Sequence, residues 1–506
     1  MGIFLTAFVL FNLTLFIGNY QITNETLKQS GLNDEQLQLV TGEMGTLPIA
    51  NLSKTELINR ISGAIEKVNT DLKQKENWNL VIYNGNDVVF NVAKAGLSGF
   101  YTENKNLYSF LVFFLGILGA LMVYLPQTKL EKPGIKNNGI FFKPLTSRGW
   151  IGIALFVYLV GFYILLYFYP FYITEMIAVA DPVSILITGT PAGKWFLYGL
   201  LYTLFVGIMG VRFIVKYRHN RYQVVRTLSV IFFQTAFAFI IPQILTILQK
   251  PYIDFKNIWP LDYSFFFSYK IQEYLNNGTF GFFMLGWGLA LMLIGVPLFT
   301  YFFGKRWYCS WVCGCGGLAE TAGDPFRQLS NKSLKAWKFE RISIYSVLIF
   351  AILMTLATLY SFFTEQNSVL GIDTYKIQSF YGFLVGSILA GVIGTGFYPV
   401  MGNRVWCRFF CPLAAYLGIV QRYKSRFRIT TNGGQCISCG NCSTYCEMGI
   451  DVRAYAQKGQ NIVRASCVGC GICAAVCPRG VLKLENADPN SRIKTNPVLT
   501  GNLNNQ

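Results

Sequence analysis

Two runs near the end of the chain, Cys436-x2-Cys439-x2-Cys442-x3-Cys446 and Cys467-x2-Cys470-x2-Cys473-x3-Cys477, decide its fold class. Each run has three cysteines at a regular spacing and a fourth after a longer gap, and Pro478 follows the second run. A zinc ribbon needs only four ligands, so it leaves the repeated third cysteine and the delayed fourth unexplained. Disulfide bonds are the other alternative. The repeated spacing favours iron–sulfur ligation over both.

The same spacing is typical of bacterial-type ferredoxins, where two such runs wrap two [4Fe–4S] cubanes. Three closely spaced thiolates bind one cubane, and the fourth reaches across to the other. We therefore expect Cys436, Cys439, Cys442 and Cys477 on one cubane, and Cys446, Cys467, Cys470 and Cys473 on the other. Glu447 stands where the first run would usually carry proline, which predicts a changed turn with the ligands intact.

Most of the remaining chain has the composition of a membrane protein. It has 506 residues, of which 53% are apolar and 13% are charged. A helix needs about 20 mostly apolar residues to span a bilayer, and such stretches cover 107–125, 150–173, 195–215, 227–248, 280–303, 342–363 and 380–402. They should be helical, because lipid offers no partner for exposed backbone groups. A shorter apolar stretch, 3–17, is interpreted as a retained anchor, because it lacks a basic leader region and a clear cleavage site.

The charges of the loops orient these spans. Loops 126–149, 216–226 and 304–341 contain sixteen Lys and Arg residues, whereas the alternate loops contain five. The positive-inside rule places the richer side in the cytoplasm. The formal net charge of +18 then reflects contact with the inner leaflet, and no nucleic-acid partner is predicted.

This orientation gives the predicted domain organisation. The segments are 1–18 as an N-terminal anchor or signal, 19–106 as an extracytoplasmic domain, 107–428 as the membrane bundle, 429–485 as a cytoplasmic ferredoxin domain and 486–506 as a C-terminal tail. The predicted fold class is a polytopic α-helical protein of the cytoplasmic (inner) membrane, with about eight spans. It adds a small extracytoplasmic α+β domain and a C-terminal bacterial-type 2[4Fe–4S] ferredoxin domain. In 19–106 we expect a helix over 54–75 and a hairpin of strands near 79–83 and 87–92, joined by Asn84-Gly85-Asn86.

A second set of cysteines lies in two matching stretches. Residues 304–313 and 402–411 share the pattern G-x-R-x2-C-x-aromatic-x-C, which indicates an internal repeat of two-helix units, 227–313 and 342–411. If the stretches are helical, each C-x3-C pair lies on one helix face, and the repeats present four thiols at the inner membrane edge: Cys309, Cys313, Cys407 and Cys411. They could ligate a further iron–sulfur centre, form redox-active disulfides, or bind copper or zinc. Inert packing is the alternative, and the matched arginines and aromatic residues argue against it. Cys315 has no counterpart in the second copy and is assigned no ligand role.

Over residues 280–480 the chain resembles membrane polyferredoxins of the NosR/NapH type, with the CcoG accessory proteins as relatives. The resemblance rests on the two cluster runs and on C-x3-C-P motifs after a span, matched by Cys407, Cys411 and Pro412. The upstream copy has Gly314 in place of the proline. Members of the NosR branch also carry covalent FMN on the threonine of a Ser-Gly-Ala-Thr motif. Here that motif reads Ser62-Gly63-Ala64-Ile65, so covalent FMN is not predicted.

The predicted function is membrane-bound iron–sulfur electron transfer between a cytoplasmic redox partner and either the quinone pool or an extracytoplasmic reductase. The resemblance also implies other membrane or extracytoplasmic redox subunits as partners. One alternative is an accessory protein that reduces or assembles metal in a copper-containing oxidase or reductase; another is a redox-sensing membrane regulator. The single histidine, His219, cannot supply a bis-histidine haem or a Rieske centre. No phosphate-binding or dinucleotide motif is present, so we expect a redox subunit without a substrate site of its own and assign no catalytic residue.

Overall fold

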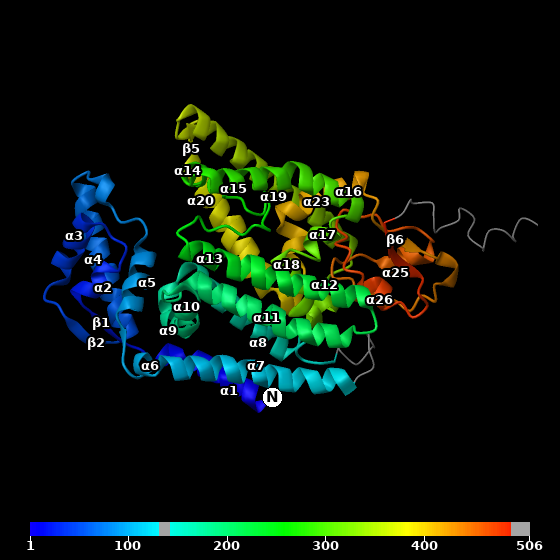
Figure 1. The fold of residues 1–506 in the computed structure, drawn as a ribbon, viewed down its shortest axis with the longest axis horizontal. Coiled ribbons are helices and arrows are strands. Elements are labelled where there is room, and N and C mark those ends of the chain that lie inside the picture. The colour runs from blue at the N-terminus through cyan, green and yellow to red at the C-terminus, as the bar shows by residue number, and fades with distance from the viewer. Residues whose placement is uncertain (131–141, 487–506) are drawn as a thin grey trace, which may run out of the picture. The chain divides into compact units, whose positions relative to one another are not determined.

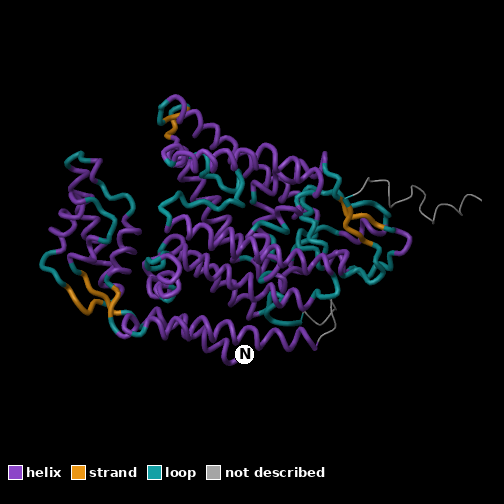
Figure 2. Tube along the Cα trace, viewed as in Figure 1, coloured by secondary structure: helices purple, strands orange, loops and turns teal. Residues whose placement is uncertain are grey.

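The computed structural model of the chain describes residues 1–130 and 142–486, which are mostly helical (Figure 1, Figure 2). It divides into two compact units. The first contains Met1–Tyr124 and Gly161–Leu201, and the second contains Leu125–Val160 and Tyr202–Gln506. Two of the basic residues used to orient the chain, Lys132 and Lys136, lie outside the described residues, as does the predicted tail beyond residue 486.

Seven helices of the described chain are long and apolar enough to cross a membrane. Four are continuous: α7 (Lys105–Leu130), α8 (Trp150–Phe168), α11 (Lys194–Lys216) and α19 (Leu334–Thr364). The other three are composite and cover Arg221–Ile247 (α12, η4, α13), Gly278–Phe303 (α15, η5, α16) and Thr374–Gly396 (α20, η7, α21). All seven coincide with the stretches predicted from hydropathy, and together they fit a membrane protein.

The N-terminal segment and a bent helix pair depart from this simple pattern. The apolar helix Gly2–Phe16 (α1, η1) is shorter than a full span, so the eighth crossing remains a prediction. Pro170–Ala178 (η3, α9) and Asp181–Thr188 (α10) meet at 72°, as in a broken span or a re-entrant loop. The straight span predicted over 150–173 therefore ends early, at Phe168. Pro170 and Pro182 each start a new helical segment, because a proline lacks the N–H needed inside a helix.

Each composite span widens into a π-helix near its middle: η4 (Phe233–Ile240), η5 (Leu291–Gly295) and η7 (Gly382–Ile393). Pro242 and Pro297 follow the first two, where the wider turn accommodates the missing N–H. In η7, Gly382 and Gly386 leave room for the side chain of Tyr263. A Cβ atom at either position would lie 3.2 or 3.0 Å from the hydroxyl oxygen of Tyr263. The η5 and η7 segments overlap when the two repeats are aligned at the spacing of their cysteines. π-Helical turns are frequent at functional sites.

The segment 19–106 contains both helices and strands, but the predicted hairpin is wrong. Strand β1 (Asn19–Ile22) pairs antiparallel with β2 (Ile49–Leu52) and β3 (Leu97–Ser98), and the predicted helix appears as α4 (Lys54–Gln74). In place of the hairpin are η2 (Trp78–Leu80) and α5 (Gly85–Ala95). The N–H of Ile82 donates to Oδ1 of Asn69 on α4 at 2.8 Å, and the carbonyl oxygen of Ile82 accepts from Nδ2 of Asn69 at 2.9 Å. The side chain of Asn69 thus takes the place of a neighbouring strand. The valines of α5 lie at helical spacing on its buried face, so their strand propensity misled the prediction.

A buried ion pair within the first unit links α5 to α10. The Nζ of Lys94 lies 2.7 Å from Oδ1 of Asp181, and both side chains are about 85% buried. The same oxygen accepts a hydrogen bond from the N–H of Ala192 at 2.8 Å. We expect Asp181→Asn to lower the free energy of unfolding by about 1–3 kcal/mol, because Lys94 loses its anionic partner. The thermal unfolding of the purified protein measures this loss. Asp71→Asn is the control and should change it by less than about 1 kcal/mol, since its pair with Lys75 is exposed.

The ferredoxin region is closed by strands β6 (Arg428–Thr431) and β7 (Leu482–Glu485), which pair antiparallel in four-residue register. Between them lie the short helices α24 (Asn441–Thr444), α25 (Val452–Gln457) and α26 (Ile472–Ala475), of which α24 packs on α26. Figure 2 shows the two strands in orange beside these turns.

Side chains from the helical bundle hold the backbone of this region. Gln421 donates to the carbonyls of Arg464 and Cys467 at 2.8 Å, and Gln223 donates to that of Cys470 at 2.8 Å. One hydrophobic core continues from the spans into the cluster runs, from Leu348 to Ile450. The second unit is therefore one packed body from the spans to the cysteines.

Candidate functional site

The eight cysteines of the two runs line two separate cavities. Cys436, Cys439, Cys442 and Cys477 line the first. Cys446, Cys467, Cys470 and Cys473 line the second. Neither cavity includes a cysteine of the other set. The fold thus brings together the two groups of four thiols expected from crosswise ligation, with the last cysteine of each run facing the cavity of the other.

Glycines at equivalent places shape both cavities. Gly440 and Gly471 follow the second cysteine of each run with φ values of 81° and 75°, a left-handed conformation that favours glycine. Each precedes a short helix, α24 or α26, that carries the third cysteine. The N–H of Val481 donates to the sulfur of Cys477 at 3.3 Å. Such N–H···S bonds are one of the means by which a protein sets the reduction potential of a cluster.

The donor set suits a cluster better than a single ion. Within residues 1–130 and 142–486, no three Cys, His, Asp or Glu side chains converge on a point that one metal ion could occupy. The thiols surround gaps instead, which is the arrangement that a cubane with one cysteine at each iron requires. Burial raises the pKa of Cys442 and of Cys467 to about 11, so loading either site must displace bound protons.

Glu447, the residue in place of proline, does more than change a turn. Its carboxylate is fully buried and pairs with Arg327 at 2.6 Å and with Arg404 at 3.1 Å. It also accepts a hydrogen bond from Asn403 at 3.2 Å. Burial alone would raise the pKa of Glu447, but Arg327 and Arg404 outweigh it and hold that pKa below its ordinary value. A residue next to Cys446 is therefore ionised and tied to the second membrane-edge motif.

The two C-x3-C motifs do not form continuous helices, which corrects the expectation of a single helical face. Cys309 ends the short helix α17 (Arg306–Cys309), and Cys313 caps α18 (Gly314–Thr321). Likewise, Cys407 lies in the π-helical turn η8 (Trp406–Phe410), and Cys411 caps α23 (Pro412–Lys424). The sulfur of Cys411 accepts the N–H of Ala414 at 3.4 Å, whereas the side chain of Cys313 makes no such capping bond. A helix N-terminus favours a thiolate.

The fold brings the four membrane-edge thiols together. All four are buried in one core, and the charge of Cys411 interacts with those of Cys407, Cys309 and Cys313. Arg404 connects the two pairs, because its Nη1 lies 3.6 Å from the sulfur of Cys407 and 3.2 Å from the carbonyl oxygen of Cys309. Its counterpart Arg306 stacks on Phe427 instead. The matched arginines of the repeat therefore have different contacts.

Cys315, which sequence analysis left without a role, lies beside this group. A hydrogen bond with the Cys315 thiol, opposed by burial and assisted by the Gly316 N–H, lowers the pKa of Cys313 to about 6. Burial raises the pKa of Cys309 to about 12. The contact joins two residues of one loop, and the spacing C-x-C was its only signal in the sequence.

A network of buried charges surrounds the membrane-edge thiols. Glu320 on α18 pairs with Arg404 and with Arg226 on α12. Arg327 pairs with Asp324 at 3.2 Å, in addition to Glu447. All of these side chains are at most 3% exposed. The network is fully desolvated, so each charge depends on its partners.

Comparisons with known proteins agree with this site. Residues 435–482 match a 4Fe-4S dicluster domain family. A second family, described as a 4Fe-4S binding domain, matches twice, over 285–333 and 383–430. These two matches contain the two membrane-edge motifs and confirm the internal repeat.

Three curated relatives match parts of the chain. YccM of Escherichia coli K12, named as an electron transport protein, is 28% identical over 29% of this chain and 43% of its own length. The ferredoxin-type methylamine utilization protein MauN of Methylobacillus flagellatus is 25% identical over 29% of this chain and 50% of its own. The uncharacterized protein MJ0750 of Methanocaldococcus jannaschii is 27% identical over 36% and 72%.

The chain thus spans about half the length of the first two relatives. No solved structure gave a significant match. The chain therefore carries ferredoxin-type 4Fe-4S domains and is similar to proteins named for electron transport and as ferredoxin-type proteins.

Proposed function

We propose that this chain is a membrane-bound iron–sulfur electron-transfer protein of the NosR/NapH type. The observation that carries the proposal is the buried connection between its two sets of cysteines. Glu447, next to Cys446, pairs with Arg404, and Arg404 contacts Cys407 at the membrane edge. These buried contacts keep the region of Cys446 close to Cys407, and electron transfer between two centres requires that they lie close together.

In this proposal two [4Fe–4S] clusters occupy the cysteine-lined cavities. Cys436, Cys439, Cys442 and Cys477 hold one cluster, and Cys446, Cys467, Cys470 and Cys473 hold the other. Each cluster, when bound, accepts and releases electrons. The protein exchanges these electrons with a cytoplasmic redox partner on one side and with the quinone pool or an extracytoplasmic reductase on the other. The loop charges support a cytoplasmic ferredoxin domain and an extracytoplasmic 19–106 domain in the inner membrane.

The membrane-edge thiols are proposed to ligate a further iron–sulfur centre. Three observations support this use over inert packing. Both motifs fall within matches to a 4Fe-4S binding domain. The sulfur of Cys411 accepts a backbone N–H at the start of α23. Arg404 places a positive charge against Cys407 and Cys309, where it offsets the charge of thiolates.

A spectroscopic experiment tests this route. Anaerobically purified protein is titrated with reductant while its paramagnetic centres are followed by electron paramagnetic resonance. We expect the double variant Cys407→Ser/Cys411→Ser to lose one signal and about four irons per chain. It should keep the two ferredoxin signals and transfer electrons to a membrane acceptor more slowly. Val312→Ala, a change within the first motif that removes no thiol and no side-chain hydrogen bond, is the control. An unchanged signal count together with unchanged transfer in the double variant contradicts the route.

A further inference from the structure

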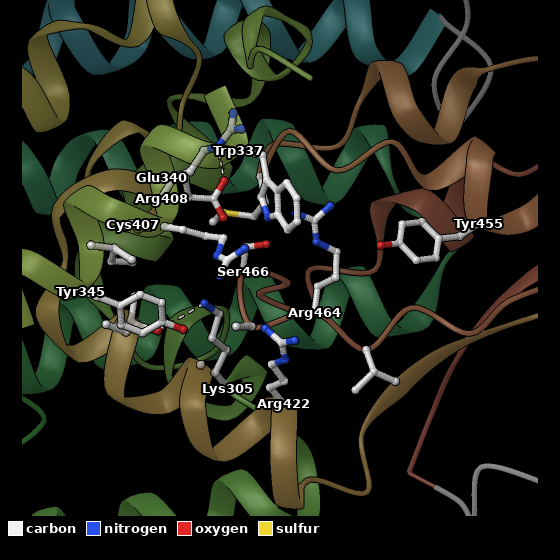
Figure 3. A pocket seen from close by; sticks show the side chains of 18 residues that line it. Lys305, Trp337, Glu340, Tyr345, Cys407, Arg408, Arg422, Tyr455, Arg464 and Ser466 are labelled. Carbon is white, nitrogen blue, oxygen red and sulfur yellow. Dashed lines mark hydrogen bonds and ion pairs between the residues drawn. The ribbon is translucent and has the colours of Figure 1, made fainter. Parts of the chain in front are cut away.

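A cleft of about 200 Å³ is lined in part by Cys407 (Figure 3). Its walls come from the first turns of α19, from α23 and from the ferredoxin loop 463–466. Figure 3 shows Lys305, Arg422 and Arg464 around the same space, with Trp337 beside them. None of the roles proposed above uses this cleft.

The lining of the cleft carries an excess of positive charge. It includes Lys305, Arg341, Arg408, Arg422 and Arg464, with Glu340 as its acidic residue. Glu340 is already engaged, because its Oε2 accepts from Nε of Arg408 at 2.8 Å. Among the described residues, the other four cations form no ion pair with a carboxylate. The cleft therefore contains four cations that no carboxylate of its lining neutralises.

Lys305 makes the strongest case for a missing anion. Its side chain is 1% exposed, and its ammonium group has one long hydrogen bond, 3.4 Å to the carbonyl oxygen of Ala414. An ammonium has three N–H donors, and a buried charge is costly unless it is paired and hydrogen-bonded. Its positive charge also acts to lower the pKa of Cys309 and of Cys467, against the larger effect of burial. An anion in the cleft would provide acceptors for the N–H donors of the ammonium group.

Two arginines of the cleft, Arg341 and Arg464, are positioned to bind such an anion. Arg341 and Arg464 stack on Trp337, with their guanidinium carbons 5.3 and 4.9 Å from the ring. A stacked guanidinium keeps its planar fork of N–H donors free at the edge, and this fork matches the oxygens of phosphate. Apolar residues also line the cleft, with Ile344 on α19 and Ala414 and Ala415 on α23. Cationic and apolar walls side by side, at the polar end of an apolar helix, suit a phosphate attached to a lipid.

We propose that this cleft binds a phosphate ester. The shared chemistry is a phosphate group contacted by Lys305, Arg422 and Arg464, and its source is either a phospholipid headgroup or a soluble organic phosphate. This proposal does not depend on the electron-transfer function, because Arg341 and Arg422 line the cleft without a carboxylate partner in the described chain, whether or not the clusters are bound. Bound there, the anion would bridge the end of α19 and the ferredoxin loop.

Native mass spectrometry of the full-length protein in mild detergent tests the lipid source. We expect about one phospholipid per wild-type chain after transfer from phosphatidylglycerol nanodiscs. The double variant Arg422→Gln/Arg464→Gln should retain at least about tenfold less, because each arginine loses charge-assisted hydrogen bonds. Lys424→Gln/Lys458→Gln is the matched control, since it removes two exposed cations near the same helix end and domain without touching the cleft. Equal iron content in all three proteins shows that folding is retained.

Calorimetric titration of delipidated protein with glycerol phosphate tests the soluble source. Binding by the wild type that the double variant loses, with no retained phospholipid, supports the phosphate site and assigns it to a soluble ester. If the double variant loses iron, Arg341→Gln, an exposed position at the mouth of the cleft, takes its place. The proposal is overturned if the control loses lipid to the same extent. It is also overturned if neither phosphatidylglycerol nor glycerol phosphate distinguishes the wild type from the variant.

Discussion

Replacing Cys477 with alanine is expected to remove the cluster of Cys436, Cys439 and Cys442 and to leave the other cluster in place. Cys477 is close in sequence to Cys473, yet it lines the cavity of the first run. The iron content should fall by about four per chain. The signal that remains should be the one retained in Cys436→Ala, because both substitutions remove a ligand from the same site.

Cys446→Ala is the matched variant for the second site. Its sulfur faces the cavity of Cys467, Cys470 and Cys473, so it should remove the signal that Cys477→Ala leaves. Redox titration with spectroscopic detection distinguishes the two clusters by their potentials. If Cys477→Ala and Cys473→Ala remove the same signal while Cys436→Ala removes a different one, each run binds its own cluster and the crosswise assignment is wrong.

Glu447→Ala is expected to destabilise the protein by about 3–5 kcal/mol. The substitution leaves Arg327 and Arg404 buried with one anionic partner fewer, since both pair with this carboxylate. Arg404 also contacts Cys407, so the membrane-edge centre should respond as well as the thermal unfolding temperature. A loss of stability with a changed membrane-edge signal, and with the iron of the ferredoxin runs retained, is the expected result.

Two further variants separate charge from packing at this position. Glu447→Gln keeps the size of the side chain but removes its charge, so it should lose most of the same stability. Lys483→Ala removes an exposed cation from the same domain and should cost less than about 1 kcal/mol. A Glu447→Ala protein as stable as the Lys483→Ala control would mean that the buried network does not hold the ferredoxin region in place.

Hydropathy and cysteine spacing predicted the parts of the structure that depend on local sequence. The seven spans follow from length and apolar content, and the grouping of the eight cysteines follows from their spacing. The prediction of a hairpin over 79–92 was wrong because β-branched residues favour a strand in the sequence, where the hydrogen-bond partners of the backbone are not visible. Here the partner of Ile82 was a single side chain, Asn69.

The missed parts of the site depend on contacts between distant residues. In the sequence, Glu447 is only a residue in place of a proline. Its partner Arg327 lies 120 residues earlier in the chain, and only the fold brings the two together. In the sequence, Lys305 is one of several basic residues of a loop, and its burial is visible only in the folded structure. The four membrane-edge cysteines lie in one buried core, and what they bind stays a prediction. The break of each motif into two short helices was not predicted, because it depends on how the second cysteine caps the helix that follows.

Gln421 and Gln223 donate hydrogen bonds to the cysteine-bearing loops and so fix these loops to the helical bundle. A small soluble ferredoxin carries charge by diffusing between partners, whereas these loops are anchored to the helices beneath them. Under the proposed function, the ferredoxin region is therefore fixed to the bundle, and we expect a soluble partner to diffuse to it. Cys439 is the exposed thiol of the first cavity, while Cys467 and Cys473 of the second are buried. Under the proposed function, the surface around Cys439 is where we expect a soluble redox partner to dock, since this thiol is the exposed one.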